Sequence, residues 1–151
     1  MEKLVALTHS MDLGLRIKCI WALKNLVFRA DLDVKKAVMK ALTWDTLSNL
    51  INEPDVHIQE QALTILRNLL HGEVKHVEFA MRSAEKKIMT DLTSRLSSHH
   101  PPALLQAIYA LCNIAASEEH KHLVMSPAII NNITVHMVCT GSQITHRTVF
   151  L

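Results

Sequence analysis

The chain has 151 residues, of which 49% are hydrophobic, and this proportion predicts a folded domain with a buried core. Only three glycines and four prolines occur, too few for the turns of a strand-rich fold, so the composition favours helices. Sixteen Lys and Arg against fourteen Asp and Glu give a formal net charge of +2, without a run of basic residues typical of nucleic-acid binding. We therefore expect no nucleic-acid partner.

The cysteine pattern indicates a reducing compartment. Cys19, Cys112 and Cys139 lie far apart and form no CxxC pair, and the first residues do not resemble a secretory signal. No apolar stretch is long enough to span a membrane. The sequence thus predicts a soluble protein of the cytoplasm and nucleus, with no membrane partner.

The first predicted elements are one long helix and two shorter ones. Asp12 precedes a segment that ends in Ile-Trp-Ala-Leu-Lys-Asn-Leu (20–26), whose aliphatic residues recur with the spacing of one helical face. Shorter apolar-periodic pieces follow at residues 33–41 and 44–51. Thr43 lies between these pieces and is a suitable N-cap for the second of them.

The second group of elements repeats this arrangement. Pro54 marks the start of a long helix that contains Leu-Thr-Ile-Leu-Arg-Asn-Leu (63–69), because proline is tolerated in the first turn. Two shorter helices are predicted at residues 74–81 and 85–96, with a break around Ser83.

A third group follows with the same order. Pro102 marks the start of a long helix that contains Ile-Tyr-Ala-Leu-Cys-Asn-Ile (108–114). The shorter pieces cover residues 118–125 and 128–138, and Pro127 separates them.

The three groups are internal repeats. The central Asn25, Asn68 and Asn113 recur at intervals of roughly 45 residues, the length of an armadillo or HEAT repeat. Three helices per repeat favour armadillo, with the two-helix HEAT repeat as the nearest alternative. We predict an all-α fold, a right-handed α-solenoid of about three armadillo repeats over residues 1–140, and an irregular tail at 141–151.

The repeated Asn suggests a binding surface. The segments resemble the third helix of armadillo-family repeats, where this Asn faces a concave groove and binds the backbone of an extended peptide. The residues alone leave an alternative, in which each Asn amide satisfies a helix end or the backbone of the preceding repeat. Three asparagines in register favour the groove. The predicted protein-binding groove consists of Trp21, Asn25, Arg67, Asn68, Tyr109 and Asn113.

Trp21 raises a more specific possibility. The segment Trp-Ala-Leu-Lys-Asn resembles a motif of importin-α, which implies binding of basic nuclear-localisation peptides. The pair of Trp and Asn is not repeated, because Thr64 and Tyr109 occupy the equivalent positions, and the acidic residues that would neutralise a lysine-rich cargo are not evident. We expect Trp21 to be packed or to make a single contact with a partner. An armadillo adaptor of nuclear transport or junctions remains the alternative function.

Three stretches point to one branch of the family. Residues 15–30, 59–72 and 107–124 resemble the armadillo subunit of the CTLH/GID ubiquitin ligase complex. The resemblance implies a non-catalytic scaffold whose partners are ubiquitin-ligase subunits, linking the substrate receptor to the RING module. Because such subunits are longer and neither end resembles a polar capping repeat, we expect part of a longer solenoid, with Leu and Met exposed on the terminal helices.

No pattern predicts chemistry. His99, His100, His120 and His122 lack the spacing of a zinc site and are predicted to lie on the surface. Cys19 and Cys112 lie among aliphatic residues and are predicted to be buried thiols rather than nucleophiles. With so few glycines there is no phosphate-binding loop. We expect no enzyme activity, cofactor, metal or small-molecule substrate. The lysines expected on a solvated convex side are Lys35, Lys36, Lys40, Lys86 and Lys87.

Overall fold

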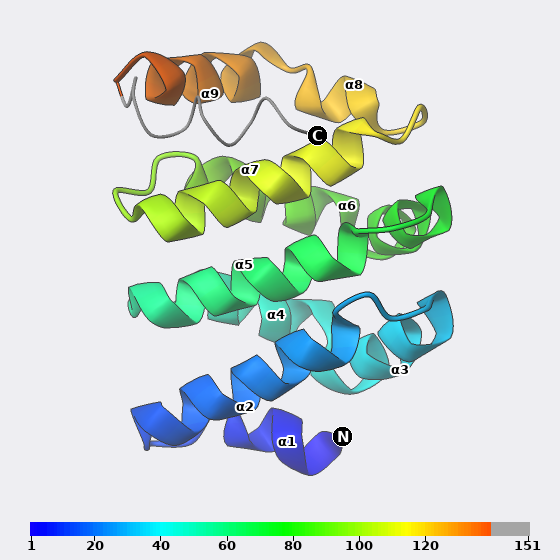
Figure 1. Ribbon diagram of the computed structural model, residues 1–151, viewed down its shortest axis with the longest axis vertical. Coiled ribbons are helices and arrows are strands. Elements are labelled where there is room, and N and C mark those ends of the chain that lie inside the picture. The colour runs from blue at the N-terminus through cyan, green and yellow to red at the C-terminus, as the bar shows by residue number, and fades with distance from the viewer. Residues whose placement is uncertain (140–151) are drawn as a thin grey trace.

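The computed structural model describes residues 1–139, which form helices and short turns without any strand (Figure 1). The predicted tail at 141–151 lies outside the described residues. The helices are α1 (Glu2–Leu7), α2 (Leu13–Val27), α3 (Leu32–Leu42), α4 (Trp44–Ile51), α5 (Val56–Leu70), α6 (Val74–Arg95), α7 (Pro101–Ala115), α8 (Lys121–Val124) and α9 (Pro127–Cys139).

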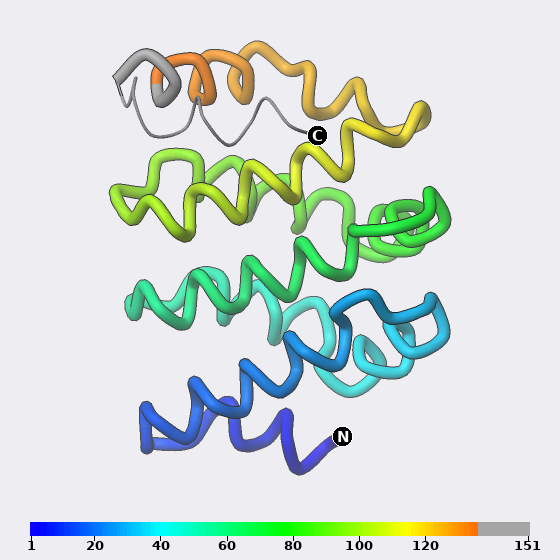
Figure 2. The backbone as a smooth tube through the Cα atoms, in the orientation of Figure 1, coloured from blue at the N-terminus to red at the C-terminus, as the bar shows by residue number. Residues whose placement is uncertain are grey.

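The long helices α2, α5 and α7 lie side by side, and they are stacked one after another along the long axis of the molecule (Figure 1). Helix α5 packs between the other two, while α4 and α6 pack against it from behind. The chain winds in the same sense from one layer to the next (Figure 2). The predicted architecture, an all-α solenoid of armadillo repeats, is confirmed.

Carboxylates cap the starts of three helices, as expected for residues that satisfy the free N–H groups of a first turn. Asp12 accepts a hydrogen bond from the Leu15 amide, and Asp31 accepts one from Val34. Asp55 caps α5 and lies directly after Pro54, so the predicted helix start is confirmed within two residues. These caps fix where the chain enters α2, α3 and α5, whereas α7 begins without a side-chain cap.

Thr43 is the predicted N-cap of α4, and the structure confirms it. Its hydroxyl accepts a hydrogen bond from the Thr46 amide while its backbone adopts a φ of 61°. This left-handed conformation is unusual for a β-branched residue and forms the sharp corner between α3 and α4.

The predicted break around Ser83 is confirmed as a kink within one helix. Helix α6 runs from Val74 to Arg95, but Ala84 has non-helical dihedral angles (φ −157°, ψ 32°). Helix α8 is shorter than the predicted 118–125, because Glu118 and Glu119 belong to the preceding turn. Sequence analysis did not predict α1.

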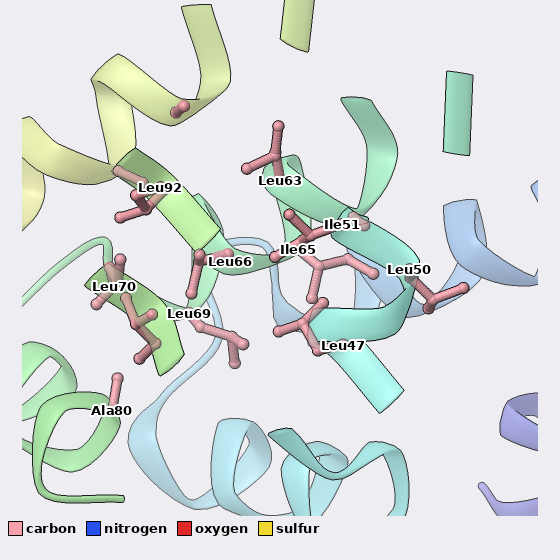
Figure 3. Packing of buried hydrophobic residues seen from close by; sticks show 14 of the residues in the cluster. Leu47, Leu50, Ile51, Leu63, Ile65, Leu66, Leu69, Leu70, Ala80 and Leu92 are labelled. Carbon is pink, nitrogen blue, oxygen red and sulfur yellow. The ribbon is translucent and has the colours of Figure 1, made fainter. Parts of the chain in front are cut away.

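The core is built from aliphatic side chains of successive layers. Leu and Ile residues of α4 and α5 converge with α6 residues such as Ala80 and Leu92 (Figure 3). Burying one such side chain stabilises the fold by about 1.5–3 kcal/mol. The predicted stripe is buried at Leu23, Leu66 and Leu111, whereas Leu26 is 43% exposed.

Exposed apolar side chains are found near both ends of the described stack, as expected for the terminal helices. Helix α1 contains no buried residue. The exposed residues near the ends are Met1, Leu7, Met11, Leu13, Leu15, Met125, Ile130 and Val135.

The prediction that Lys35 lies on a solvated side is wrong, because this side chain is only 1% exposed. Its Nζ donates hydrogen bonds to the carbonyl oxygens of Leu69 (3.3 Å) and His71 (2.6 Å), at the C-terminal end of α5. Those carbonyls lack helical partners and carry the negative end of the helix dipole, so they attract a buried cation. The other lysines predicted to be solvated, Lys36, Lys40, Lys86 and Lys87, are exposed.

Two further surface assignments need correction. His120 was expected on the surface but is buried, where its Nδ1 lies 3.2 Å from the Ser117 hydroxyl. Cys112 was expected to be buried but is exposed, whereas Cys19 is buried as predicted. Within residues 1–139, no helix is both long and apolar enough to span a membrane.

Candidate protein-binding surface

The predicted binding residues lie on one side of the stack, on helices α2, α5 and α7. On each long helix, residues four and seven positions before the central Asn share its side, because these spacings return to one face of a helix. The residue just before the Asn borders that side. We call this side the long-helix face; it consists of Lys18, Trp21, Lys24, Asn25, Gln61, Thr64, Arg67, Asn68, Gln106, Tyr109, Cys112 and Asn113. Asn68 is buried within it, with 3% of its surface exposed.

The asparagine side chains differ in what they bind. The Asn68 amide donates to the carbonyl oxygen of Lys24 at 3.4 Å, and the Asn113 amide donates to that of Arg67 at 3.2 Å. In these two repeats the Asn amide thus satisfies the backbone of the preceding repeat, which was the alternative to peptide binding in the sequence analysis. Asn25 is exposed, and its side-chain amide has no hydrogen-bond partner among residues 1–135, whose side chains the structure describes. Asn25 is therefore the one of the three whose amide remains available.

A second set of contacts joins the long helices at equivalent positions of successive repeats. Lys24 Nζ donates to Gln61 Oε1 (2.8 Å), and Arg67 Nη1 donates to Gln106 Oε1 (3.0 Å). Each basic residue immediately precedes the central Asn of its repeat, and each Gln lies seven positions before the next one. Sequence analysis missed both glutamines, although their common register was a signal that could have found them.

The aromatic residues of the predicted site lie beside the same cations. Lys24 Nζ is 5.7 Å from the centre of the Trp21 ring, and the Arg67 guanidinium is 5.7 Å from that of Tyr109. Such cation–π contacts contribute about 0.5–1 kcal/mol at exposed sites. Trp21 is 49% exposed, so it is not packed in the core, and the alternative of a single contact with a partner stays a prediction. Its ring is available to a partner.

The charge of this surface is positive. Helices α2, α5 and α7 carry one acidic residue, Glu60, which lies 3.6 Å from His100. Arg16 is paired with Glu53. Among the described side chains (residues 1–135), the other lysine and arginine residues of these three helices form no ion pair with a carboxylate. These cations are Lys18, Lys24 and Arg67.

The potential metal ligands of the described residues lie apart. No three His, Cys, Asp or Glu side chains of residues 1–135, the part whose side chains the structure describes, lie close enough to hold a metal ion. Partial burial among its neighbours raises the pKa of the Cys112 thiol, whereas a nucleophilic cysteine needs a lowered pKa.

Sequence comparison relates the chain to larger proteins. It is 36% identical over 126 residues to armadillo repeat-containing protein 8 of Danio rerio, which covers 83% of this chain and 19% of that protein. It is 30% identical over 118 residues to GID complex subunit 5 of Schizosaccharomyces pombe, which covers 78% of this chain and 15% of that protein. The chain therefore spans less than one fifth of each relative. No family model matches the chain.

Structural comparison gives the same fold. A designed armadillo repeat protein in complex with the peptide (KR)4 matches with a TM-score of 0.76 at 14% identity, covering 91% of this chain and 56% of that chain. A computationally designed armadillo repeat protein for modular peptide recognition matches with a TM-score of 0.75, covering 90% and 56%. In sequence and in fold, the chain belongs to the armadillo-repeat proteins.

Proposed function

We propose that this chain is a non-catalytic protein-binding scaffold. The observation that carries the proposal is the long-helix face, where an exposed Trp21 ring and an available Asn25 amide lie one helical turn apart. Aromatic side chains exposed on a rigid helical surface are typical anchors of protein interfaces.

We further propose that the partners are subunits of a CTLH/GID ubiquitin ligase complex in the cytoplasm and nucleus. In this proposal the chain contributes to the armadillo subunit that links the substrate receptor to the RING module. Its support is the similarity to armadillo repeat-containing protein 8 and GID complex subunit 5 along most of the chain. The proposal concerns only the surfaces present here, because the relatives are much longer.

The test is affinity purification of the full, tagged chain from cells, followed by mass spectrometry. We expect RING and LisH-CTLH subunits to be enriched over a tag-only control. A double variant, Trp21→Ala with Asn25→Ala, is compared with Lys36→Ala with Lys86→Ala, which changes exposed residues of the shorter helices. A folded wild-type chain that recovers no ligase subunit would contradict the assignment to this complex.

An armadillo adaptor of nuclear transport or junctions is the second candidate, favoured by the exposed Trp21 next to Asn25. The structural neighbour in complex with (KR)4 shows that such a fold binds a basic peptide in that protein. Here the unpaired Lys18, Lys24 and Arg67 would repel one. Binding of (KR)4 that is lost in Trp21→Ala and Asn25→Ala would support the adaptor, and absence of binding would favour the scaffold.

A further inference from the structure

We propose that the long-helix face binds an acidic, extended segment of a partner protein. The inference rests on the proposed scaffold function and specifies the chemistry of one partner. It concerns the face itself, so it does not depend on which complex the chain joins.

Three uncompensated cations carry the argument. Lys18 is exposed, whereas Lys24 and Arg67 are half-buried and held in place by their contacts with Gln61 and Gln106. Because glutamine is neutral, these hydrogen bonds orient the cations without cancelling their charge. A charged donor that is already oriented loses less conformational entropy when it binds a carboxylate.

The spacing of the cations fits an extended chain. Lys24 and Arg67 occupy the same position of adjacent repeats, on helices α2 and α5 that pack side by side. Packed helices lie about 8–10 Å apart, and an extended peptide advances about 3.3 Å per residue. Carboxylates three residues apart in a partner would therefore meet successive repeats.

The first repeat offers two further contacts to the same segment. The Asn25 amide is exposed and can bind a peptide carbonyl or N–H group, since it has both a donor and an acceptor. The exposed part of the Trp21 ring lies beside it and can cover an apolar side chain. We therefore expect an apolar residue in the acidic segment, opposite α2.

The same features disfavour other occupants. A basic peptide would meet side chains of the same charge. The single carboxylate of the three long helices is Glu60, which lies 3.6 Å from His100. A nucleic acid would find only three unpaired lysine and arginine side chains on this face, and the net charge of the chain is only +2, far from the dense basic stripe of such binders.

The first experiment measures fluorescence anisotropy of three labelled peptides that share one background with a single Leu. The peptides carry Glu, Gln or Lys at every third position. We expect the Glu peptide to bind, to weaken as salt rises, and to bind at least tenfold tighter than the Lys peptide. Equal or tighter binding of the Lys peptide, or of single-stranded DNA, would overturn the proposal, as would no binding of the Glu peptide.

The second experiment identifies the surface. Lys18→Gln, Lys24→Gln and Arg67→Gln should each weaken binding of the Glu peptide about threefold to tenfold. Lys36→Gln and Lys86→Gln are the matched controls, since they remove the same charge from exposed positions of α3 and α6 and should have no effect. Lys18 makes no inter-repeat contact, so its variant tests binding without disturbing the stack. Equal losses in the controls would overturn the proposed surface.

The two proposals can fail separately. If the chain recovers ligase subunits from cells but none of the variants changes peptide binding, the acidic-segment inference is wrong and the scaffold function stands. If the Glu peptide binds as predicted but no ligase subunit is recovered, the assignment to the ligase is wrong and the surface stands.

Discussion

A buried basic cluster lies where the end of α5 meets α3 and α6. Burial lowers the pKa of Lys35 to about 8, so the side chain is still protonated at neutral pH. Its Nζ lies 3.2 Å from Nδ1 of His76, whose Nε2 is buried without a hydrogen-bond partner. Gly72 makes room for this ring, because a Cβ atom at position 72 would lie 2.6 Å from Nδ1 of His76. Its φ of 116° is also a conformation that favours glycine. The cluster therefore depends on a neutral His76.

This arrangement predicts a loss of stability in mild acid. Burial, aided by the charge of Lys35, lowers the pKa of His76 below its usual 6.5, although the His71 carbonyl and Glu73 oppose this shift. The unfolded chain then binds the proton more readily, so the free energy of unfolding decreases as pH falls below about 6.5 toward the folded pKa. Urea unfolding at several pH values from neutral to mildly acidic should show this decrease.

His76→Gln is the variant that isolates the effect, because glutamine does not titrate in this range. Its free energy of unfolding should decline less between neutral and mildly acidic pH than that of the wild type. His99→Gln, at an exposed histidine, should leave the wild-type slope unchanged. Identical slopes in all three proteins would contradict the role given to His76.

At the scale of helices, the repeated Asn has a structural role in two of three repeats. Asn68→Ala and Asn113→Ala each remove a hydrogen bond to the preceding long helix and should lower the free energy of unfolding by about 0.5–2 kcal/mol. Asn25→Ala should change it by less than about 0.5 kcal/mol, because that side chain is exposed and unbonded. Chemical denaturation of the three variants measures the difference, and an equal cost at Asn25 would contradict this interpretation.

Sequence predicted the helices best where capping residues and periodicity agree. Helix α4 has the predicted bounds of 44–51, since Thr43 caps its start. The kink at Ala84 lies next to the predicted break at Ser83, but whether the two halves separate or stay joined depends on packing. Short α1 lacked a repeat partner in the sequence and was not predicted.

Parts of the site were beyond sequence reasoning for a physical reason. The burial of Lys35 depends on carbonyl groups of Leu69 and His71, more than thirty positions away, and nothing local signals it. The exposure of Cys112 could have been predicted from the sequence. The equivalent positions in the other repeats are Lys24 and Arg67, whose charged groups must reach water. Comparison between repeats was thus more informative than the neighbours in sequence.

For the whole molecule, burial of a repeat position depends on its neighbouring layers. Leu26 and Leu69 follow the central Asn in successive repeats, yet the first is 43% exposed and the second 0%. Leu69→Ala should therefore cost about 2–5 kcal/mol of unfolding free energy, whereas Leu26→Ala should cost less than about 1 kcal/mol. Thermal or urea unfolding tests this pair, and similar losses would mean that the stack distributes its stability differently.

Stability should also vary along the stack. Helix α5 packs against layers on both sides and has nine buried residues, whereas α1 has none. Hydrogen exchange measured by mass spectrometry should therefore be slowest in α5 and fastest in α1, since local opening requires less burial to be lost at the edge. Uniform exchange from α1 to α7 would instead indicate a single cooperative unit.

The bonds of Asn68 and Asn113 to the preceding helix have a mechanical consequence. A peptide that recruits these amides must take them from the carbonyl oxygens of Lys24 and Arg67, so binding would loosen the joints between layers. The cohesion of neighbouring layers and the occupancy of the face would then be linked, since both draw on the same hydrogen bonds.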